Sequence, residues 1–199
     1  MKIGIGETLR EAFGDGFRYP EAEVVPAEIR ALLINEVVPA DPGDDFYGGN
    51  AFPAYPGSAL PLFRAAGAEA DSMADLSALG IYITNAVKRP KRTYEVAGED
   101  FEASLPLLEA EFDLFPNLKA VMLMGDVAKR MFNIIAKKRS GRNVIPSGST
   151  YKLRGEAFHF GGIRVFPSYI MTGGNLQIEK SKFEMASADI ARMLELLNA

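Results

Sequence analysis

The sequence predicts an α/β fold: a single-domain, three-layer sandwich with a central, mostly parallel four-stranded sheet. Four apolar, strand-like segments recur far apart in the chain, at residues 32–36, 81–85, 121–125 and 163–169. A polar or turn-forming residue stands at or beside the end of each, namely Glu36, Asn85, Gly125 and Ser168. Segments with helical periodicity separate them. Because open parallel sheets bind ligands beyond the carboxyl ends of their strands, these four ends are expected to meet in one crevice.

Length and composition limit the classes of protein. The 199 residues fit one domain, 1–199. No apolar stretch approaches the roughly 20 residues that a membrane span requires, and the N-terminus lacks a secretory signal pattern, so we expect a cytoplasmic protein without membrane contact. Without Cys, disulfides, thiolate zinc sites and Cys-held iron-sulphur clusters are excluded, and His159 is the single His. We therefore predict no metal and no cofactor.

Charge is unevenly distributed along the chain. Residues 1–85 hold 5 basic and 13 acidic side chains, whereas residues 86–199 hold 17 and 13. The later basic residues cluster at 88–92 and again between 129 and 142, a pattern that suits phosphate contacts. For the second cluster, a solvated helix face is an equal alternative. The acidic cluster of Glu36, Asp41, Asp44 and Asp45 suits Mg²⁺ or, more simply, solvated loop charges.

The first half of the chain gives the following elements. Residues 1–25 show no clean period and stay unassigned. Pro26 and Glu28 favour a short helix before a buried strand at 31–38, which Pro39 ends. Residues 39–61 contain five Pro and four Gly and predict one long loop. Pro61 then opens a short helix that stops at Gly67, and a second helix is expected at 71–79 before the strand that leads to Asn85.

The second half gives two further strands and three helices. Apolar residues at helical spacing predict an amphipathic helix at 99–115, closed by Pro116. A strand at 118–124 turns at Gly125 into a helix at 127–138, and 140–149 is a polar connection. Residues 151–153 and 157–160 are expected to form a hairpin that leads into the last strand at Ile163. A C-terminal helix is expected at 176–197.

Four of these segments resemble, in order, the motifs of the uracil-DNA glycosylase superfamily. Gly-Ile-Tyr-Ile-Thr-Asn-Ala-Val-Lys-Arg-Pro at 80–90 is similar to the second motif, in which a Thr-Asn-x-Val-Lys run ends a central strand. Ile-Asn-Glu-Val-Val-Pro at 34–39 resembles the first motif, in which Glu follows the first strand. Residues 120–128 resemble the apolar strand that turns through Gly into a helix, and 165–169 lie where the third motif begins. The resemblance spans 30–197 and implies a uracil-DNA glycosylase-like fold.

The chain departs from that family in two ways. The branch with the most similar second motif holds an iron-sulphur cluster on four Cys, and this chain has no Cys, so a cluster-free relative is implied. The third motif normally supplies a His after its Tyr or Pro, whereas residues 170–175 here contain none. Because that His would assist departure of the base, Ser168, Tyr169 or backbone N–H groups at 172–175 would have to donate instead. We expect slow activity or a different base.

The residue types at the strand ends indicate a site that could bind a nucleobase. The Asn85 amide offers a donor and an acceptor to a base edge, and Phe46 or Tyr47 would stack on its face, or belong to the core. Glycosidic cleavage needs a carboxylate near the anomeric carbon, for which Glu36 comes first and Asp41, Asp44 or Asp45 are alternatives. A capping or ion-pairing Glu36 is the competing interpretation. The basic loop, Lys88, Arg89, Lys91 and Arg92, would contact the flanking phosphates.

These features predict a DNA base-excision glycosylase that hydrolyses the N-glycosidic bond of uracil or another deaminated base extruded from single- or double-stranded DNA. A non-catalytic nucleic-acid-binding relative is one alternative. A hydrolase of nucleosides or nucleotides is another, because an open α/β sheet does not fix the function. A dinucleotide-binding fingerprint is absent, since Gly4 and Gly6 are not placed between a strand and a helix with a third glycine.

Overall fold

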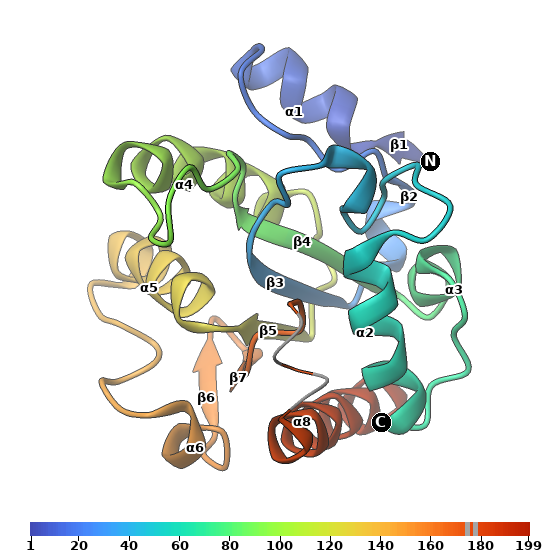
Figure 1. Cartoon of the computed structure of the whole chain (residues 1–199). Coiled ribbons are helices and arrows are strands. Elements are labelled where there is room, and N and C mark those ends of the chain that lie inside the picture. Colours follow the sequence, from blue (N-terminus) through green and yellow to red (C-terminus); the bar gives the residue numbers. More distant parts are fainter. Residues whose placement is uncertain (174–175, 177–178) are drawn as a thin grey trace.

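The computed structural model, which describes residues 1–173, 176 and 179–199, shows an α/β fold with a mostly parallel five-stranded sheet (Figure 1). The strand order is β4-β3-β5-β7-β6. Four strands are parallel, as predicted: β3 (Ala31–Val37), β4 (Ile81–Val87), β5 (Ala120–Met124) and β7 (Ile163–Ser168). The fifth, β6 (Phe158–Phe160), pairs antiparallel with β7 and extends the predicted sheet.

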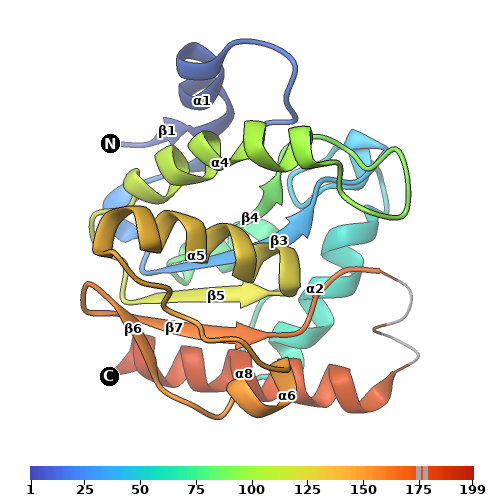
Figure 2. The same cartoon turned by 90° about the vertical axis from the view of Figure 1, so that its left-hand side faces the viewer.

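Helices cover both faces of this sheet. On one face lie α4 (Gly98–Asp113) and α5 (Asp126–Ser140), and on the other lie α2 (Ala54–Ala65), α3 (Met73–Ala78) and α8 (Lys180–Asn198) (Figures 1 and 2). Alternation along β3 explains the two cores, because Leu32 and Ile34 pack with the α4 and α5 layer while Leu33 packs with α2 and α8. None of the described helices is both long and apolar enough to span a bilayer.

The unassigned N-terminal residues form a small ordered unit. It consists of β1 (Ile3–Gly4), α1 (Ile5–Phe13) and β2 (Glu23–Val24), followed by the short 3₁₀ helix η1 (Pro26–Glu28) at the expected place. Ile5 and Leu9 bury one face of α1 against the core. The buried positions of this nine-residue helix are Ile5, Gly6 and Leu9, and the glycines at and near its ends obscure its periodicity in the sequence.

Two predictions about local structure are wrong. Residues 150–153 form the short helix α6 (Thr150–Leu153) instead of a strand, so the hairpin is made by β6 and β7. Its turn is Gly161-Gly162, both with positive φ, which suits a tight two-residue connection. Pro61 lies inside α2, not at its start, because α2 begins at Ala54 after the 3₁₀ helix η2 (Pro42–Asp44). Burial of Ala59, Leu62 and Phe63 offsets the hydrogen bond that Pro61 removes.

The remaining predicted helices occur with shifted ends. The amphipathic helix at 99–115 is α4, the helix after Gly125 is α5, and the helix at 71–79 is the shorter α3. The C-terminal helix α8 begins at Lys180, not at residue 176. Residues 177 and 178 of the predicted helix lie outside the described residues.

Candidate functional site at the carboxyl edge of the sheet

The carboxyl ends of the four parallel strands lie at one edge of the sheet, and Figure 2 shows their arrowheads directed to that edge. From β3 the chain goes first to β4 on one side and then to β5 on the other. This reversal marks a switch point beside β3, the place where open α/β sheets bind ligands. The connections after β3, β4 and β7 form its surroundings.

A row of hydrogen-bonded side chains, the polar row, crosses the buried end of the sheet. Thr172 Oγ1 donates to Asn35 Oδ1 (3.3 Å), Asn35 Nδ2 donates to Asn85 Oδ1 (2.9 Å), and Asn85 Nδ2 donates to Asp45 Oδ1 (2.8 Å). Asn35 and Asn85 are register partners on adjacent strands, so their side chains share one face. Burial raises the pKa of Asp45, and hydrogen bonds from the Phe46 N–H and Asn85 oppose that shift.

Glu36 points to the opposite face of the sheet from Asn35 and Asn85. Its Oε1 accepts the Val127 N–H (3.1 Å) in the first turn of α5, where the helix dipole favours a carboxylate. Gly125, with φ of 114°, precedes that turn, and a Cβ there would collide with the Glu36 carboxylate. Glycine is therefore required at 125 both for its backbone conformation and for the close approach of Glu36.

Glu36 lines a pocket of about 290 Å³, here called the switch-point pocket. Its other lining residues are Val37, Val38, Pro39, Ala40, Tyr55, Lys91, Ile170, Thr172 and Gly173. The volume lies just below the range of about 300–1,000 Å³ that is usual for small-molecule sites. Asn85 does not line this pocket, and its amide is already bonded to Asn35 and Asp45. The structure thus brings Glu36 and Thr172 to one pocket and leaves Asn85 in the row behind it.

The other candidate acids have local partners. Asp41 is exposed and accepts the Gly43 N–H at the start of η2, which lowers its pKa, and Asp44 accepts from Asn50 and from the Ala54 N–H. Asp45 lines a separate pocket of about 330 Å³ next to Tyr47 and the N-terminal unit. Over residues 1–173, 176 and 179–199, no three Asp, Glu or His side chains gather as metal ligands would.

The two candidate stacking rings lie away from the switch-point pocket. Phe46 is buried, with its ring centroid 5.3 Å from that of Tyr55. The Tyr47 hydroxyl donates to the Ile83 carbonyl (3.1 Å) and accepts the Ile83 N–H (3.2 Å). Because β4 is an edge strand, the outward backbone N–H and C=O of Ile83 have no neighbouring strand, and the Tyr47 hydroxyl supplies their hydrogen-bond partner. Both rings also line a groove of about 940 Å³ beside α2.

Replacing Tyr47 by Phe is expected to lower the free energy of unfolding by about 1–3 kcal/mol, because the Ile83 N–H and C=O lose their partner while the ring packing stays. Urea denaturation followed by circular dichroism measures the change. Tyr94→Phe, at a side chain 95% exposed, is the matched control and should leave stability unchanged. Equal midpoints for the two variants would contradict the edge-pairing role.

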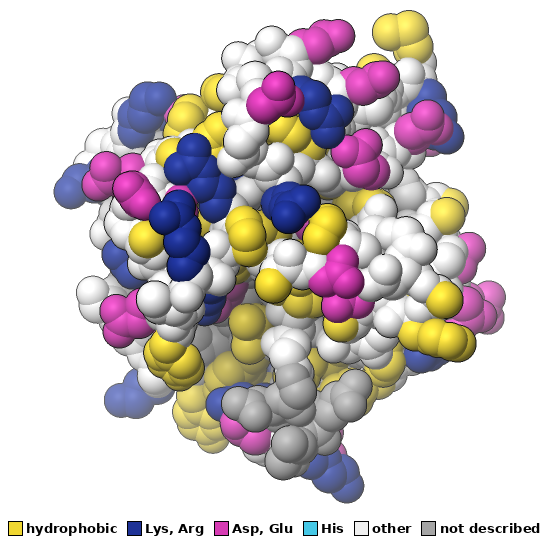
Figure 3. Space-filling view, turned by 45° about the horizontal axis from the view of Figure 1, so that its top comes forward, with side chains coloured by type: hydrophobic (Ala, Val, Ile, Leu, Met, Phe, Trp, Pro, Cys, Tyr) yellow, Lys and Arg dark blue, Asp and Glu magenta, His cyan; other side chains and the backbone are white. Residues whose placement is uncertain are grey.

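The basic loop is only partly at the surface. Lys88 is buried, and its ammonium bonds Glu111 and Thr84, so the predicted phosphate contact by Lys88 is wrong. The Arg89 guanidinium lies over Phe17 and bonds Asp100, whereas Lys91 and Arg92 are exposed. On the face of the molecule that Figure 3 shows, Lys and Arg side chains are interspersed with Asp and Glu side chains.

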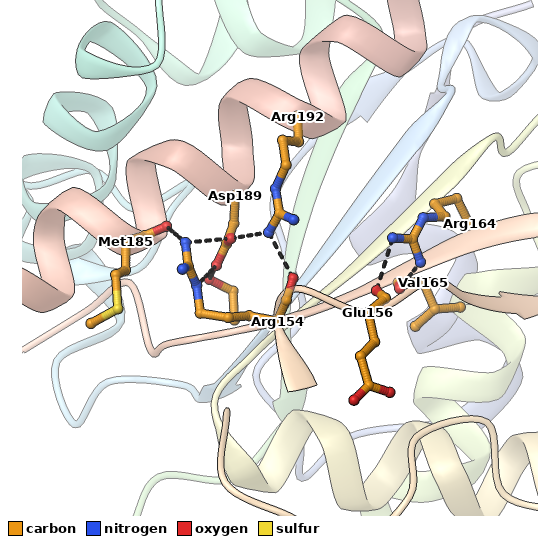
Figure 4. Close-up of polar contacts among 8 residues, drawn as sticks. Arg154, Glu156, Arg164, Val165, Met185, Asp189 and Arg192 are labelled. Atoms are coloured by element: carbon orange, nitrogen blue, oxygen red, sulfur yellow. Dashed lines mark hydrogen bonds and ion pairs between the residues drawn. The ribbon is translucent and has the colours of Figure 1, made fainter. Parts of the chain in front are cut away.

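Ser168 links the end of β7 to α8 through a side-chain hydrogen bond. Its hydroxyl donates to Asp189 Oδ2 (2.6 Å), and the fully buried Asp189 carboxylate also binds the guanidinium groups of Arg154 and Arg192 (Figure 4). A hydroxyl engaged in this way is not directed at the switch-point pocket, so the predicted donor role of Ser168 is not supported. Tyr169 is half-buried and does not line the pocket. Gly174 and Asn175, the other expected backbone donors, lie outside the described residues.

Sequence reasoning missed Asn35 and gave Thr172 only a backbone role. A signal for Asn35 exists, because an amide inside an otherwise apolar strand must find a hydrogen-bond partner once it is buried. His159 gave no functional signal, and it is an exposed residue of β6.

The fold and the site define an α/β protein with one carboxylate in a small pocket at the switch point of its sheet. Comparison of the chain with protein-family models gave no match, and comparison with curated proteins also gave none.

Proposed function

We propose that the protein binds a nucleotide with its base in the switch-point pocket and hydrolyses the N-glycosidic bond, as a cytoplasmic, cluster-free relative of the uracil-DNA glycosylase superfamily. The position of Glu36 carries this proposal. Glu36 is the penultimate residue of β3, the first parallel strand, near the strand end where the family resemblance expects the motif Glu, and it lines a small pocket. The uracil-DNA glycosylase-like fold is part of the same proposal.

The chemistry of this pocket suits glycosidic cleavage. The bond breaks through an oxocarbenium-like state, which a nearby carboxylate stabilises while it orients the attacking water. The Val127 N–H holds one oxygen of Glu36, so the carboxylate has a fixed position. Lys91 lines the same pocket and is exposed, which suits contact with a flanking phosphate.

The experiment is a base-excision assay. Single- and double-stranded oligonucleotides containing uracil, hypoxanthine, xanthine or each ordinary base are incubated with the full chain, and abasic sites are revealed by alkaline strand cleavage. We expect cleavage at one class of base. Intact strands for every base would reject the hydrolase.

A second candidate is a nucleic-acid-binding relative without catalysis. The observation that favours it is the Asn85 amide, which is bonded to Asn35 and Asp45 and so is not free to pair with a base edge. This candidate predicts salt-dependent binding of oligonucleotides that Lys91→Ala with Arg92→Ala weakens, without release of any base.

A further inference from the structure

The switch-point pocket has an unusual set of hydrogen-bonding side chains. Glu36, Tyr55, Thr172 and Lys91 are the side chains among its described lining residues that carry such groups. Tyr55 and Thr172 each donate their hydroxyl proton to another group of the protein, and the ionised Glu36 carboxylate has no proton to donate. The kind of ligand that the pocket accepts follows from this.

Tyr55 offers lone pairs to the pocket. Its hydroxyl donates to the Val37 carbonyl (2.7 Å), so its single proton is used. Burial raises the pKa of Tyr55 to about 12, with the charge of Asp45 adding to the shift, so the phenol keeps that proton at neutral pH. The oxygen can therefore accept a hydrogen bond from a ligand but cannot donate one.

Thr172 also offers lone pairs, because each hydrogen bond of the polar row runs from donor to acceptor in the direction from Thr172 to Asp45. Asp45 Oδ1 accepts the Phe46 N–H (2.8 Å), which can only donate, so this oxygen is an acceptor and Asn85 must turn its Nδ2 to it. The Asn85 Oδ1 then faces Asn35 Nδ2, which leaves the Asn35 Oδ1 toward Thr172. The hydroxyl of Thr172 donates to Asn35 Oδ1 (3.3 Å), which leaves its lone pairs for a ligand.

Glu36 completes the acceptor set. When ionised, its carboxylate has no proton to give, and its Oε1 already takes the Val127 N–H. Lys91 is the one side-chain donor among the described lining residues, and it belongs to an exposed loop. Apart from Lys91, the side chains with hydrogen-bonding groups among these lining residues thus present acceptors.

We infer that the pocket selects a base rich in hydrogen-bond donors, one that carries an amino group as cytosine or adenine does, over its oxo counterpart, uracil or hypoxanthine. This inference rests on the proposed function and narrows its substrate class, away from the deaminated bases that the family resemblance implies. A carbonyl oxygen facing these acceptors has no partner, and the ring N–H that the oxo base gains supplies one donor proton where the amino group supplies two.

Two isosteric pairs test the inference. Oligonucleotides that contain a single cytosine or uracil, or a single adenine or hypoxanthine, in an otherwise abasic context are titrated against the full chain by isothermal calorimetry. We expect the amino-bearing member of each pair to bind about tenfold more tightly, the value of one good hydrogen bond. Thr172→Val should reduce that ratio severalfold and Thr172→Ser should restore it, with circular dichroism confirming that both variants fold.

The outcomes separate this inference from the proposed function. Equal or tighter binding of uracil and hypoxanthine overturns the inference, and their excision would still support a glycosylase. Selective binding of cytosine and adenine without any abasic product supports the inference and rejects hydrolysis. Failure of all four bases to add affinity over the abasic strand overturns the inference, and any excision is then carried by another site.

Discussion

Replacing Glu111 by Ala should lower the free energy of unfolding by about 3–5 kcal/mol, the cost of leaving a buried charge without its partner. Glu111 on α4 and Lys88 after β4 form an ion pair whose side chains are 0% and 1% exposed. The Lys88 ammonium lies 2.6 Å from Glu111 Oε2. A domain is stable by only about 5–15 kcal/mol, so this loss is a large fraction of the total.

The surroundings of the pair explain why the loss should be large. The Tyr82 hydroxyl donates to Glu111 Oε1 (2.5 Å), and Lys88 Nζ also donates to Thr84 Oγ1 (2.5 Å). Burial and the Glu111 charge raise the pKa of Tyr82 well above its usual value, so the phenol remains a donor. Glu111→Ala therefore leaves both the Lys88 ammonium and the Tyr82 hydroxyl buried without their hydrogen-bond acceptor.

The measurement is urea denaturation at neutral pH, followed by far-ultraviolet circular dichroism. Glu99→Ala is the matched control on the same helix. Its side chain is 69% exposed and 3.6 Å from Arg92, so it should lose no more than about 1 kcal/mol. Lys88→Met combined with Glu111→Leu should recover most of the stability, because two apolar side chains replace both charges. Similar losses for Glu99→Ala and Glu111→Ala would refute the buried pair.

Lys88 also shows where prediction of the surface fails. The run Lys-Arg-Pro-Lys-Arg at 88–92 is typical of a surface loop, and nothing local distinguishes its first residue from the others. The difference comes from Glu111, 23 positions later, which α4 places over the end of β4. The strands themselves were predictable, since each buried parallel strand is built around apolar residues.

For Glu36 and Asn85, the sequence predicted the positions near the strand ends correctly, but not that the two side chains take opposite faces of the sheet. Sequence places Glu36 and Asn85 at the carboxyl ends of neighbouring strands, and the structure has them there. Which face each side chain takes depends on strand register, and a shift by one residue reverses every side chain. The register pairs Asn35, not Glu36, with Asn85, a fact that long-range pairing decides.

Glu36→Gln is expected to lower the rate of base excision by about 10²- to 10⁴-fold, the usual contribution of a positioned acid or base. The amide oxygen of Gln can still accept the Val127 N–H, so the fold and the pocket shape should persist. The charge that stabilises an oxocarbenium-like state is lost. Single-turnover formation of abasic sites, with enzyme in excess over the oligonucleotide that the wild-type chain cleaves, measures the change.

Two variants of the neighbouring acids make this prediction specific. Asp41→Asn, at an exposed residue that caps η2, should leave the excision rate within a few-fold of wild type. Asp45→Asn should act less strongly than Glu36→Gln, because Asp45 does not line the switch-point pocket. A larger loss at Asp45 than at Glu36 would move the chemistry to the pocket of about 330 Å³ that Asp45 lines beside Tyr47, and Glu36 would then serve only to hold the first turn of α5.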